Sequence, residues 1–268
     1  MKKLFYIVLS GCLLLSSSVY AKKSKDLVLC TWNLGYFSNG ISSISSIDVV
    51  NYKESLAKYR CLIYSEILPD VITLNEYNYV FCGKNDKNNP YLTSSLLFNG
   101  FKKKQFGPKC LGVSNAIFSK IKMTKFRFFY FESQKITAGD DEVKLRDNYF
   151  LESDLYIQGK KIKLVCLHLL FSGKVREVFQ QNQIEELISR YKKTDRVILS
   201  GDWNTEMYSA LKDAGYELAN DGSLKTFPSK GYALDNIAVK GLNISDVRMI
   251  KTNLSDHYPL ICRLSLKE

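Results

Sequence analysis

Short apolar runs that end in polar residues recur along the whole chain, and this pattern predicts many β-strands. The runs are rich in Val, Ile, Leu and Phe, and turn-forming residues separate most of them. The predicted strands comprise residues 26–34, 71–76, 113–119, 125–133, 148–157, 161–170, 196–204, 233–239, 244–250 and 258–266.

Helical spacing of apolar residues occurs in fewer places. It predicts a helix over residues 51–67, ended by Pro69, and further helices over residues 174–191 and 209–215. Strands outnumber helices, and most connections between strands lack a helix. Two mostly antiparallel sheets therefore fit better than a doubly wound parallel sheet. No repeat and no long low-complexity tract is visible, so we expect one domain.

Polar residues of a few types gather where the predicted strands end. Both histidines of the chain are among them. If these strand ends share one edge of a sandwich, their side chains converge in one cleft. The residues are Asn33, Glu76, His168, Asp202, Asn204, Asp235, Asp256 and His257.

Each of these residues also has a purely structural interpretation. Asp and Asn are common turn residues, so Asp202 and Asn204 alone would indicate a turn. A histidine flanked by leucines, as His168 is, is more often a core residue with a satisfied ring than a catalytic one. Glu76 fits a solvated strand end as well. Only the recurrence of the pattern at several strand ends favours an active site.

The first residues of the chain have the pattern of a targeting segment. A short basic start precedes an apolar run, and small residues stand at Val19 and Ala21, where a signal peptidase reads the chain. We expect a signal peptide over residues 1–21 and a single domain over residues 22–268. The stretch "LSGC", ending at Cys12, leaves a lipoprotein as the alternative. Either leader implies export from the cytoplasm.

The chain is basic, with 38 Lys and Arg against 27 Asp and Glu and a net charge of +11. Loss of Lys2 and Lys3 with the leader lowers this to +9. A basic exported protein favours polyanionic partners such as nucleic acid, anionic lipid or phosphorylated sugars. The lysine runs at residues 102–104 and 160–161 also fit an ordinary solvated surface.

Six cysteines follow the leader, and none forms a C-x-x-C pair, which argues against a structural zinc site. Cys30, Cys166 and Cys262 lie in apolar runs and are expected to act as small core residues. Cys82 and Cys110 lie near predicted loops and are the best candidates for a disulfide. The sequence does not determine the pairing.

Seven stretches in order resemble the endonuclease/exonuclease/phosphatase superfamily, the deoxyribonuclease-I-like proteins. They read "TWNL", "LNE", "SNAIFS", "LHL", "GDWN", "TFP…ALDNI" and "SDHYP", and they extend from Thr31 to Pro259. The resemblance implies an α/β fold, a four-layered sandwich of two packed sheets with helices outside. It also implies hydrolysis of phosphate esters with a divalent cation, Mg²⁺ or alternatively Mn²⁺.

The resemblance implies a metal site as well. Glu76 would be the principal ligand, and Asn33 and Asp256 would add oxygen atoms. Magnesium prefers hard oxygen ligands, few of them from the protein. A cation would neutralise phosphate charge that otherwise repels a nucleophile.

The remaining residues would act on water and phosphate. Asp202 would orient or deprotonate the attacking water, and the amide of Asn204 would hold a phosphoryl oxygen. His257 would donate to phosphate or act as general acid or base, with its tautomer fixed by Asp235. His168 would donate to the phosphate or the leaving group.

Some positions depart from the superfamily pattern. Asn75 stands where a glutamine often precedes the metal-binding glutamate, and Trp203 replaces a commoner phenylalanine. Gly35 stands where abasic-site endonucleases carry an aspartate, which argues against a dedicated DNA-repair role. Arg146 and Arg176 lie near stretches that could face phosphate, although surface arginine is the simpler interpretation.

The substrate stays open at this stage. A secreted nuclease acting on DNA or RNA is the first hypothesis, supported by charge and export. A phosphomonoesterase, or a sphingomyelinase-like phospholipase C acting on lipid headgroups or inositol phosphates, is the alternative. Its membrane contact would be "FRFFYF" at residues 126–131, although alternation into the core is the simpler interpretation. An inactive binding module conflicts with the full set of polar residues. A monomer is expected, and the choice between endo and exo cleavage is open.

Overall fold

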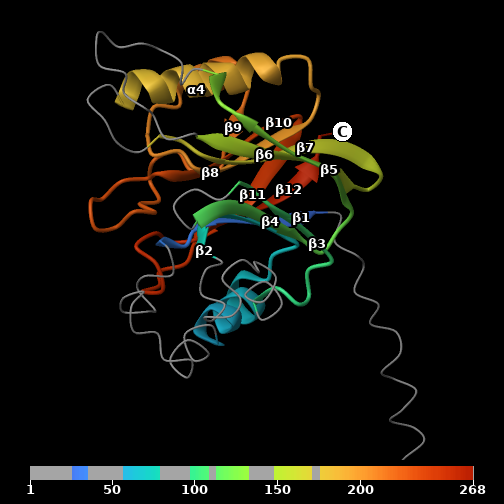
Figure 1. The fold of residues 1–268 in the computed structure, drawn as a ribbon, viewed down its shortest axis with the longest axis vertical. Coiled ribbons are helices and arrows are strands. Elements are labelled where there is room, and N and C mark those ends of the chain that lie inside the picture. The colour runs from blue at the N-terminus through green and yellow to red at the C-terminus, as the bar shows by residue number, and fades with distance from the viewer. Residues whose placement is uncertain are drawn as a thin grey trace, which may run out of the picture.

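The computed structural model describes residues 26–35, 57–78, 97–108, 113–132, 148–170 and 176–267. Two β-sheets face each other, and helices cover their outer faces (Figure 1). Helix α4 (Arg176–Arg190) covers one sheet. The helix of residues 57–67, drawn in teal in Figure 1, covers the other. The layers are therefore helix, sheet, sheet and helix.

Each sheet has six strands. The first contains β1 (Leu27–Asn33), β2 (Val71–Asn78), β3 (Lys103–Phe106), β4 (Val113–Ser119), β11 (Leu242–Met249) and β12 (Leu260–Leu266), in the order β11-β12-β1-β2-β4-β3. The second contains β5 (Met123–Tyr130), β6 (Tyr149–Ile157), β7 (Lys160–His168), β8 (Val197–Asp202), β9 (Glu217–Leu218) and β10 (Asp235–Lys240), in the order β5-β6-β7-β8-β10-β9.

Each sheet has one parallel pair near its centre among the described strands. β1 is parallel to β2, and β7 is parallel to β8, while every other pair is antiparallel. The carboxyl ends of a parallel pair lie at the same edge of a sheet. This arrangement confirms two mostly antiparallel sheets, and it brings four strand ends to one end of the sandwich.

Three apolar layers hold the sandwich together. The faces between the sheets bury residues such as Leu29, Leu164 and Ile198. Trp32 packs against Tyr59 under the outer helix of the first sheet, with ring centroids 5.4 Å apart. Under α4, Leu187 joins the outer face of the second sheet. Burial of such side chains contributes about 1.5–3 kcal/mol each relative to exposure.

The predicted helices have observed counterparts with different limits. In the helix expected over residues 51–67, the described part ends as a π-helix, η2 (Leu62–Ile67). The second predicted helix corresponds to α4, and the third to α5 (Ser209–Asp213). Strands β3 and β9 were not predicted, because a short edge strand of charged residues carries no apolar alternation.

Residues 126–131 were interpreted either as a membrane contact or as a strand that alternates into the core, and the structure has aromatic side chains on both sides of this strand. Phe129 and Phe131 pack with Phe150, so these side chains alternate into the core. Phe126, Phe128 and Tyr130 remain 46%, 49% and 48% exposed on the edge strand β5. Aromatic residues therefore point both inward and outward from this strand.

The cysteines in apolar runs behave as expected. Cys30, Cys166 and Cys262 are buried free thiols, and Cys61 is an exposed free thiol. Burial raises the pKa of the Cys262 thiol to about 12. The candidate disulfide between Cys82 and Cys110 lies outside the described residues, as does Arg146.

Candidate active site

The polar residues singled out in the sequence do lie at one end of the sandwich. β1 ends at Asn33, which lies near Glu76 in the last part of β2 because Asn33 pairs with Asn75. In the second sheet His168 pairs with Asp202, which also pairs with Asp235 at the start of β10. The segment before β12 carries the other two, Asp256 and His257.

Asp202 joins the two sheets at this end. Its Oδ2 atom accepts a hydrogen bond of 2.9 Å from Asn33 Nδ2, which comes from the opposite sheet. The same oxygen lies 3.6 Å from His168 Nε2 and 3.8 Å from His257 Nε2. Oδ1 accepts a hydrogen bond from the backbone N–H of Asn204 at 2.8 Å. The carboxylate is therefore buried and held at both oxygens.

The glycine before Asp202 explains part of the "GDWN" sequence. Gly201 lies so close to β7 that a Cβ atom there would stand 1.9 Å from the carbonyl oxygen of Leu167. Only glycine allows this approach, which keeps the ends of β7 and β8 together. Asn204 follows with a positive φ of 51°. Left-handed backbone outside glycine is strained and occurs often at functional sites.

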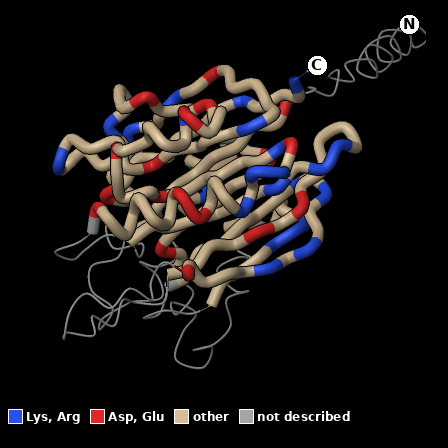
Figure 2. The backbone as a smooth tube through the Cα atoms, turned by 90° about the horizontal axis from the view of Figure 1, so that it is seen from above, with Lys and Arg blue, Asp and Glu red and all other residues tan. Residues whose placement is uncertain are grey.

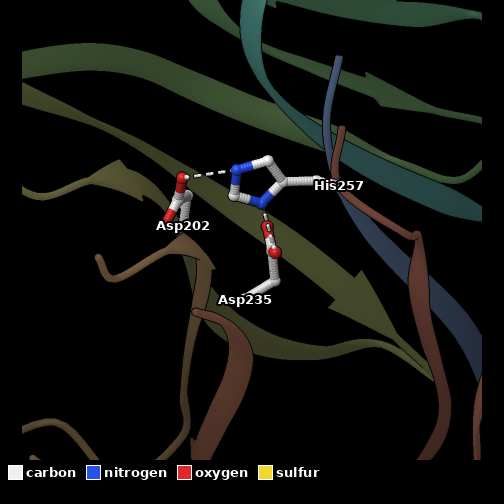
Figure 3. Close-up of side chains that lie close together, drawn as sticks. All are labelled: Asp202, Asp235 and His257. Carbon is white, nitrogen blue, oxygen red and sulfur yellow. Dashed lines mark hydrogen bonds and ion pairs between the residues drawn. The ribbon is translucent and has the colours of Figure 1, made fainter. Parts of the chain in front are cut away.

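His257 lies between two carboxylates (Figure 3). Its Nδ1 atom is 2.7 Å from Asp235 Oδ2, and its Nε2 atom faces Asp202. Burial disfavours the charged imidazole, but Asp235 and then Asp202 outweigh it and raise the pKa of His257 to about 10. The ring is therefore an imidazolium at neutral pH, with Asp235 as its fixed partner.

Three contacts hold the histidine segment in position. Trp32 Nε1 donates a hydrogen bond of 3.0 Å to the carbonyl oxygen of His257. Ser255 Oγ donates to the carbonyl oxygen of Asn33 at 2.7 Å and accepts from the backbone N–H of His257 at 3.1 Å. The ring of Phe227 lies 4.7 Å from the imidazole. The imidazole is thus positioned from the first sheet as well as from the second.

Glu76 differs from the other carboxylates because no described residue donates a hydrogen bond to it. It sits where the register between β2 and β4 shifts, and it has a positive φ of 51°. A bulge of this kind turns a side chain away from the regular alternation. Burial, and the nearby charges of Asp202 and Asp256, raise the pKa of Glu76, while both histidines lower it.

Asp256 approaches the first sheet at Gly35. A Cβ atom on Gly35 would lie 2.3 Å from Asp256 Oδ1, and Gly35 has a positive φ of 51°. Ser255 Oγ contacts the same carboxylate oxygen at 3.2 Å. A side chain at Gly35 would therefore require the Asp256 carboxylate to move.

The two amides expected to act at the site are partly engaged. Asn33 Oδ1 accepts from the backbone N–H of Gly35 at 3.0 Å while its Nδ2 donates to Asp202. Asn204 Nδ2 donates to the carbonyl oxygen of Leu169 at 3.0 Å. An amide nitrogen carries two hydrogens, so Asn204 keeps one for another acceptor.

Sequence reasoning missed the amides that join the sheets beneath the site. Asn75 Oδ1 accepts the backbone N–H of Asp202 at 2.8 Å, and its Nδ2 donates to Asn115 Oδ1 and to the Leu167 carbonyl, each at 2.8 Å. Gln180 of α4 similarly donates to the carbonyl of Asn204 at 2.7 Å. The one signal in the sequence was an amide within an apolar run, and the structure shows Asn75 fully buried, where such a group requires partners.

The donor set suits a divalent cation. Asp202 and Asp256 both act electrostatically on Glu76, and the Glu76 carboxylate has no described hydrogen-bond donor. Ligand atoms of Asp202, Asp235 and His257 also lie within 4.8 Å of one another. The hydrogen bond between Asp235 and His257 engages two of these three, so the open oxygens belong mainly to the first group. Hard oxygen atoms of this kind favour magnesium or manganese.

Comparison with solved structures identifies the architecture. The chain superposes on an endonuclease/exonuclease/phosphatase structure from Beutenbergia cavernae with a TM-score of 0.67 and 17% identity, covering 90% of this chain and 72% of that one. The fold is that of the endonuclease/exonuclease/phosphatase superfamily. Human Nocturnin, solved with a bound sulfate, gives a TM-score of 0.61 and 17% identity, covering 90% of this chain and 94% of its own.

Further comparisons agree with this fold at low identity. D. rerio TDP2, complexed with a single strand DNA product, gives a TM-score of 0.62 and 16% identity, covering 90% of this chain and 99% of its own.

No protein-family model matches the chain. A UPF0294 protein of Vibrio vulnificus strain CMCP6 is 30% identical over 122 residues. That match covers 42% of this chain and 42% of the relative.

Proposed function

We propose that this protein is a divalent-metal-dependent phosphoesterase that hydrolyses phosphodiester bonds of nucleic acid. One observation carries the proposal: the buried pair of His257 and Asp235 faces Asp202, beside the Glu76 carboxylate that lacks a described donor. Such a group of acids and an imidazolium can bind a cation, a phosphate and a water molecule together. The superfamily fold supports the same class of reaction.

Glu76 would be the main metal ligand, with Asp256 and Asn33 beside it. When bound, the cation would neutralise charge on the phosphate and so make attack on phosphorus easier. The charges of Asp202 and Asp256 each repel the charge of the Glu76 carboxylate. A cation relieves this repulsion, which is a physical reason for the site to bind one.

The chain's own groups would then handle water and phosphate. Asp202 is held by Asn33 and by the backbone of Asn204, so it can accept a proton or a hydrogen bond from water in a fixed direction. The imidazolium of His257 would donate from Nε2 to a phosphoryl oxygen, since Asp235 occupies Nδ1. His168, whose side chain is 24% exposed, would donate from the solvent side.

Nucleic acid is the proposed substrate for two reasons. D. rerio TDP2, which shares the fold, was solved with a single strand DNA product. The leader pattern of residues 1–21 and the basic composition also fit an exported enzyme that meets foreign or released nucleic acid. We therefore propose that the protein works outside the cytoplasm and uses magnesium or manganese.

A phospholipase C activity is the second candidate, favoured by the exposed aromatic side chains of Phe126, Phe128 and Tyr130. The two are separated by incubating the protein with plasmid DNA, a single-stranded oligonucleotide, sphingomyelin vesicles and inositol phosphates, with magnesium and with chelator. We expect magnesium-dependent cleavage of the nucleic acids. Release of phosphocholine without cleavage of DNA would transfer the assignment to the lipid substrate.

A further inference from the structure

The end of the sandwich opposite the candidate active site contains both ends of the described chain and several connections between strands. β1 begins there with Leu27, which pairs with Leu264 near the end of β12. The connections from β4 to β5 and from β10 to β11 cross between the sheets at this end, and the β6–β7 hairpin closes there as well. Both ends of the described chain therefore lie at this pole.

Lysines gather on this pole, which we term the lysine face. They stand at the start of β3, in the β4–β5 connection, in the β6–β7 hairpin and between α4 and β8. Seven of them are exposed: Lys102, Lys103, Lys122, Lys160, Lys161, Lys192 and Lys193. Many Lys and Arg positions lie on the side of the molecule where the C-terminus lies (Figure 2).

Lysines outnumber carboxylates on the lysine face, where the exposed Asp195 shares a connection with Lys192 and Lys193 and Asp26 precedes β1. None of the seven exposed lysines forms an ion pair with a carboxylate among the described residues. Glu217 at this end pairs with Lys267, and Asp70 Oδ2 accepts the backbone N–H of Val28. Such a one-sided field has a range of about 8 Å at physiological salt and attracts an extended anionic surface.

We propose that the lysine face docks on a bilayer that contains anionic lipid, with the active site directed away from it. The described fold begins with Asp26 at this pole, and the leader of residues 1–21 precedes it in the sequence. A chain tethered or released at a membrane would therefore present this face to the lipid first. Clustered lysines beside an apolar segment are a recognised arrangement for anionic headgroups.

Nucleic acid is a poorer occupant for this face. A strand bound there would lie at the end of the β-strands opposite Asp202 and His257, so it would not be presented for cleavage. The lysines also come from several loops around a broad pole. A broad positive surface matches a planar anionic layer, and the bound protein would keep its active site open to substrate.

The test measures partition of the full chain into vesicles by sedimentation. Phosphatidylcholine vesicles report what the apolar leader contributes, and phosphatidylglycerol vesicles add the charge. We expect much tighter binding to phosphatidylglycerol, weakened by salt. Replacement of Lys103, Lys160 and Lys161 by Gln removes three charges from the face. At about fivefold per lysine, the preference for phosphatidylglycerol should fall about a hundredfold.

A matched variant has Lys58, Lys230 and Lys251 replaced by Gln, which removes the same charge from exposed positions away from the face. It should keep most of the preference, and circular dichroism should be unchanged in both variants. Equal losses in the two variants, or no preference for phosphatidylglycerol, would overturn the proposal. The proposal would also be overturned if the variant with Lys103, Lys160 and Lys161 replaced lost binding to duplex DNA but kept its binding to phosphatidylglycerol vesicles. Hydrolysis of a soluble diester by the same variants is measured separately, so the proposed function stands or fails independently.

Discussion

Gly35 leaves no room for a side chain beside the segment that carries Asp256. A methyl group there would meet Asp256 Oδ1 at 2.3 Å, and the positive φ adds backbone strain. We expect Gly35→Ala to fold but to displace Asp256. If the site bears a strain of about 1–3 kcal/mol, turnover should fall roughly 5- to 160-fold.

Gly159→Ala is the matched control for this variant. Gly159 also has a positive φ, of 78°, but no atom lies within 4 Å of a Cβ there. It should lose a little stability and no turnover in a steady-state assay. Equal turnover in the two variants would show that the contact with Asp256 is irrelevant to the reaction.

The two histidines offer a second test at the residue scale. Removal of the imidazolium of His257 leaves Asp235 buried without its partner, and removal of His168 takes away the part-exposed imidazole 3.6 Å from Asp202. His257→Ala and His168→Ala should each lower kcat by at least ~10²-fold, the usual scale for general acid and base groups. Near-wild-type rates in both variants would contradict the roles assigned to them.

Single residues were the scale at which the sequence was most informative about function. Asn33, Glu76, Asp202 and His257 stood out because polar groups interrupted strand patterns, and the structure brings them to one end. The supporting amide of Asn75 could not be recognised as such. Its partners lie 40 to 127 positions away in the chain, and a sequence pattern does not show contacts across the sandwich.

At the scale of elements, the buried carboxylate of Glu152 in β6 binds side chains from both neighbouring strands and from the end of α4. Glu152 is 3% exposed and accepts hydrogen bonds from Lys163 at 2.9 Å and from the Tyr191 hydroxyl at 2.8 Å. Burial would raise its pKa, but Lys163, Tyr191 and Arg127 outweigh burial and lower it. The ionised form is therefore the one that stabilises the fold.

Glu152→Gln should lower the free energy of unfolding by about 3 kcal/mol at pH 7, the cost of breaking a buried pair. A carboxyl with a lowered folded pKa contributes its stability above the unfolded pKa and loses it as pH falls through the folded value. The difference from wild type in urea unfolding should thus shrink in acid. Glu217→Gln, which breaks an exposed pair, should cost under about 1 kcal/mol. Equal effects of the two changes would refute the buried role.

Elements with strong periodicity were predictable, and those without it were not. β4 was predicted with its observed limits, and its apolar residues Ala116, Ile117 and Phe118 stand between Gly112 and Lys120. β3 carries Lys103 and Lys104 at the edge of a sheet, where solvated charge is favourable and alternation is absent. The π-helical geometry of η2 accompanies its packing against the first sheet, and no local sequence pattern predicts it.

At the scale of the whole molecule, the connections without helices and the seven stretches that resemble the superfamily in order sufficed to predict two packed sheets with outer helices. The distribution of charge was not predictable in the same way. The lysine runs at residues 102–104 and 160–161 are far apart in the sequence, yet both lie at the pole opposite the active site. Net charge alone therefore said little about where a polyanion would bind, since the fold decides which lysines share a face.

The central claim is that a cation held by Glu76 drives phosphodiester hydrolysis at this end of the sandwich. Its most direct test is the magnesium dependence of bis(p-nitrophenyl) phosphate hydrolysis by wild type, Glu76→Gln and the exposed control Glu66→Gln. We expect wild type and Glu66→Gln to require magnesium and to stop in chelator. Glu76→Gln should fold normally and lose at least ~10²-fold in rate, as for loss of a key electrostatic group. Full activity of Glu76→Gln at low magnesium, or wild-type hydrolysis that persists in chelator, would contradict the account.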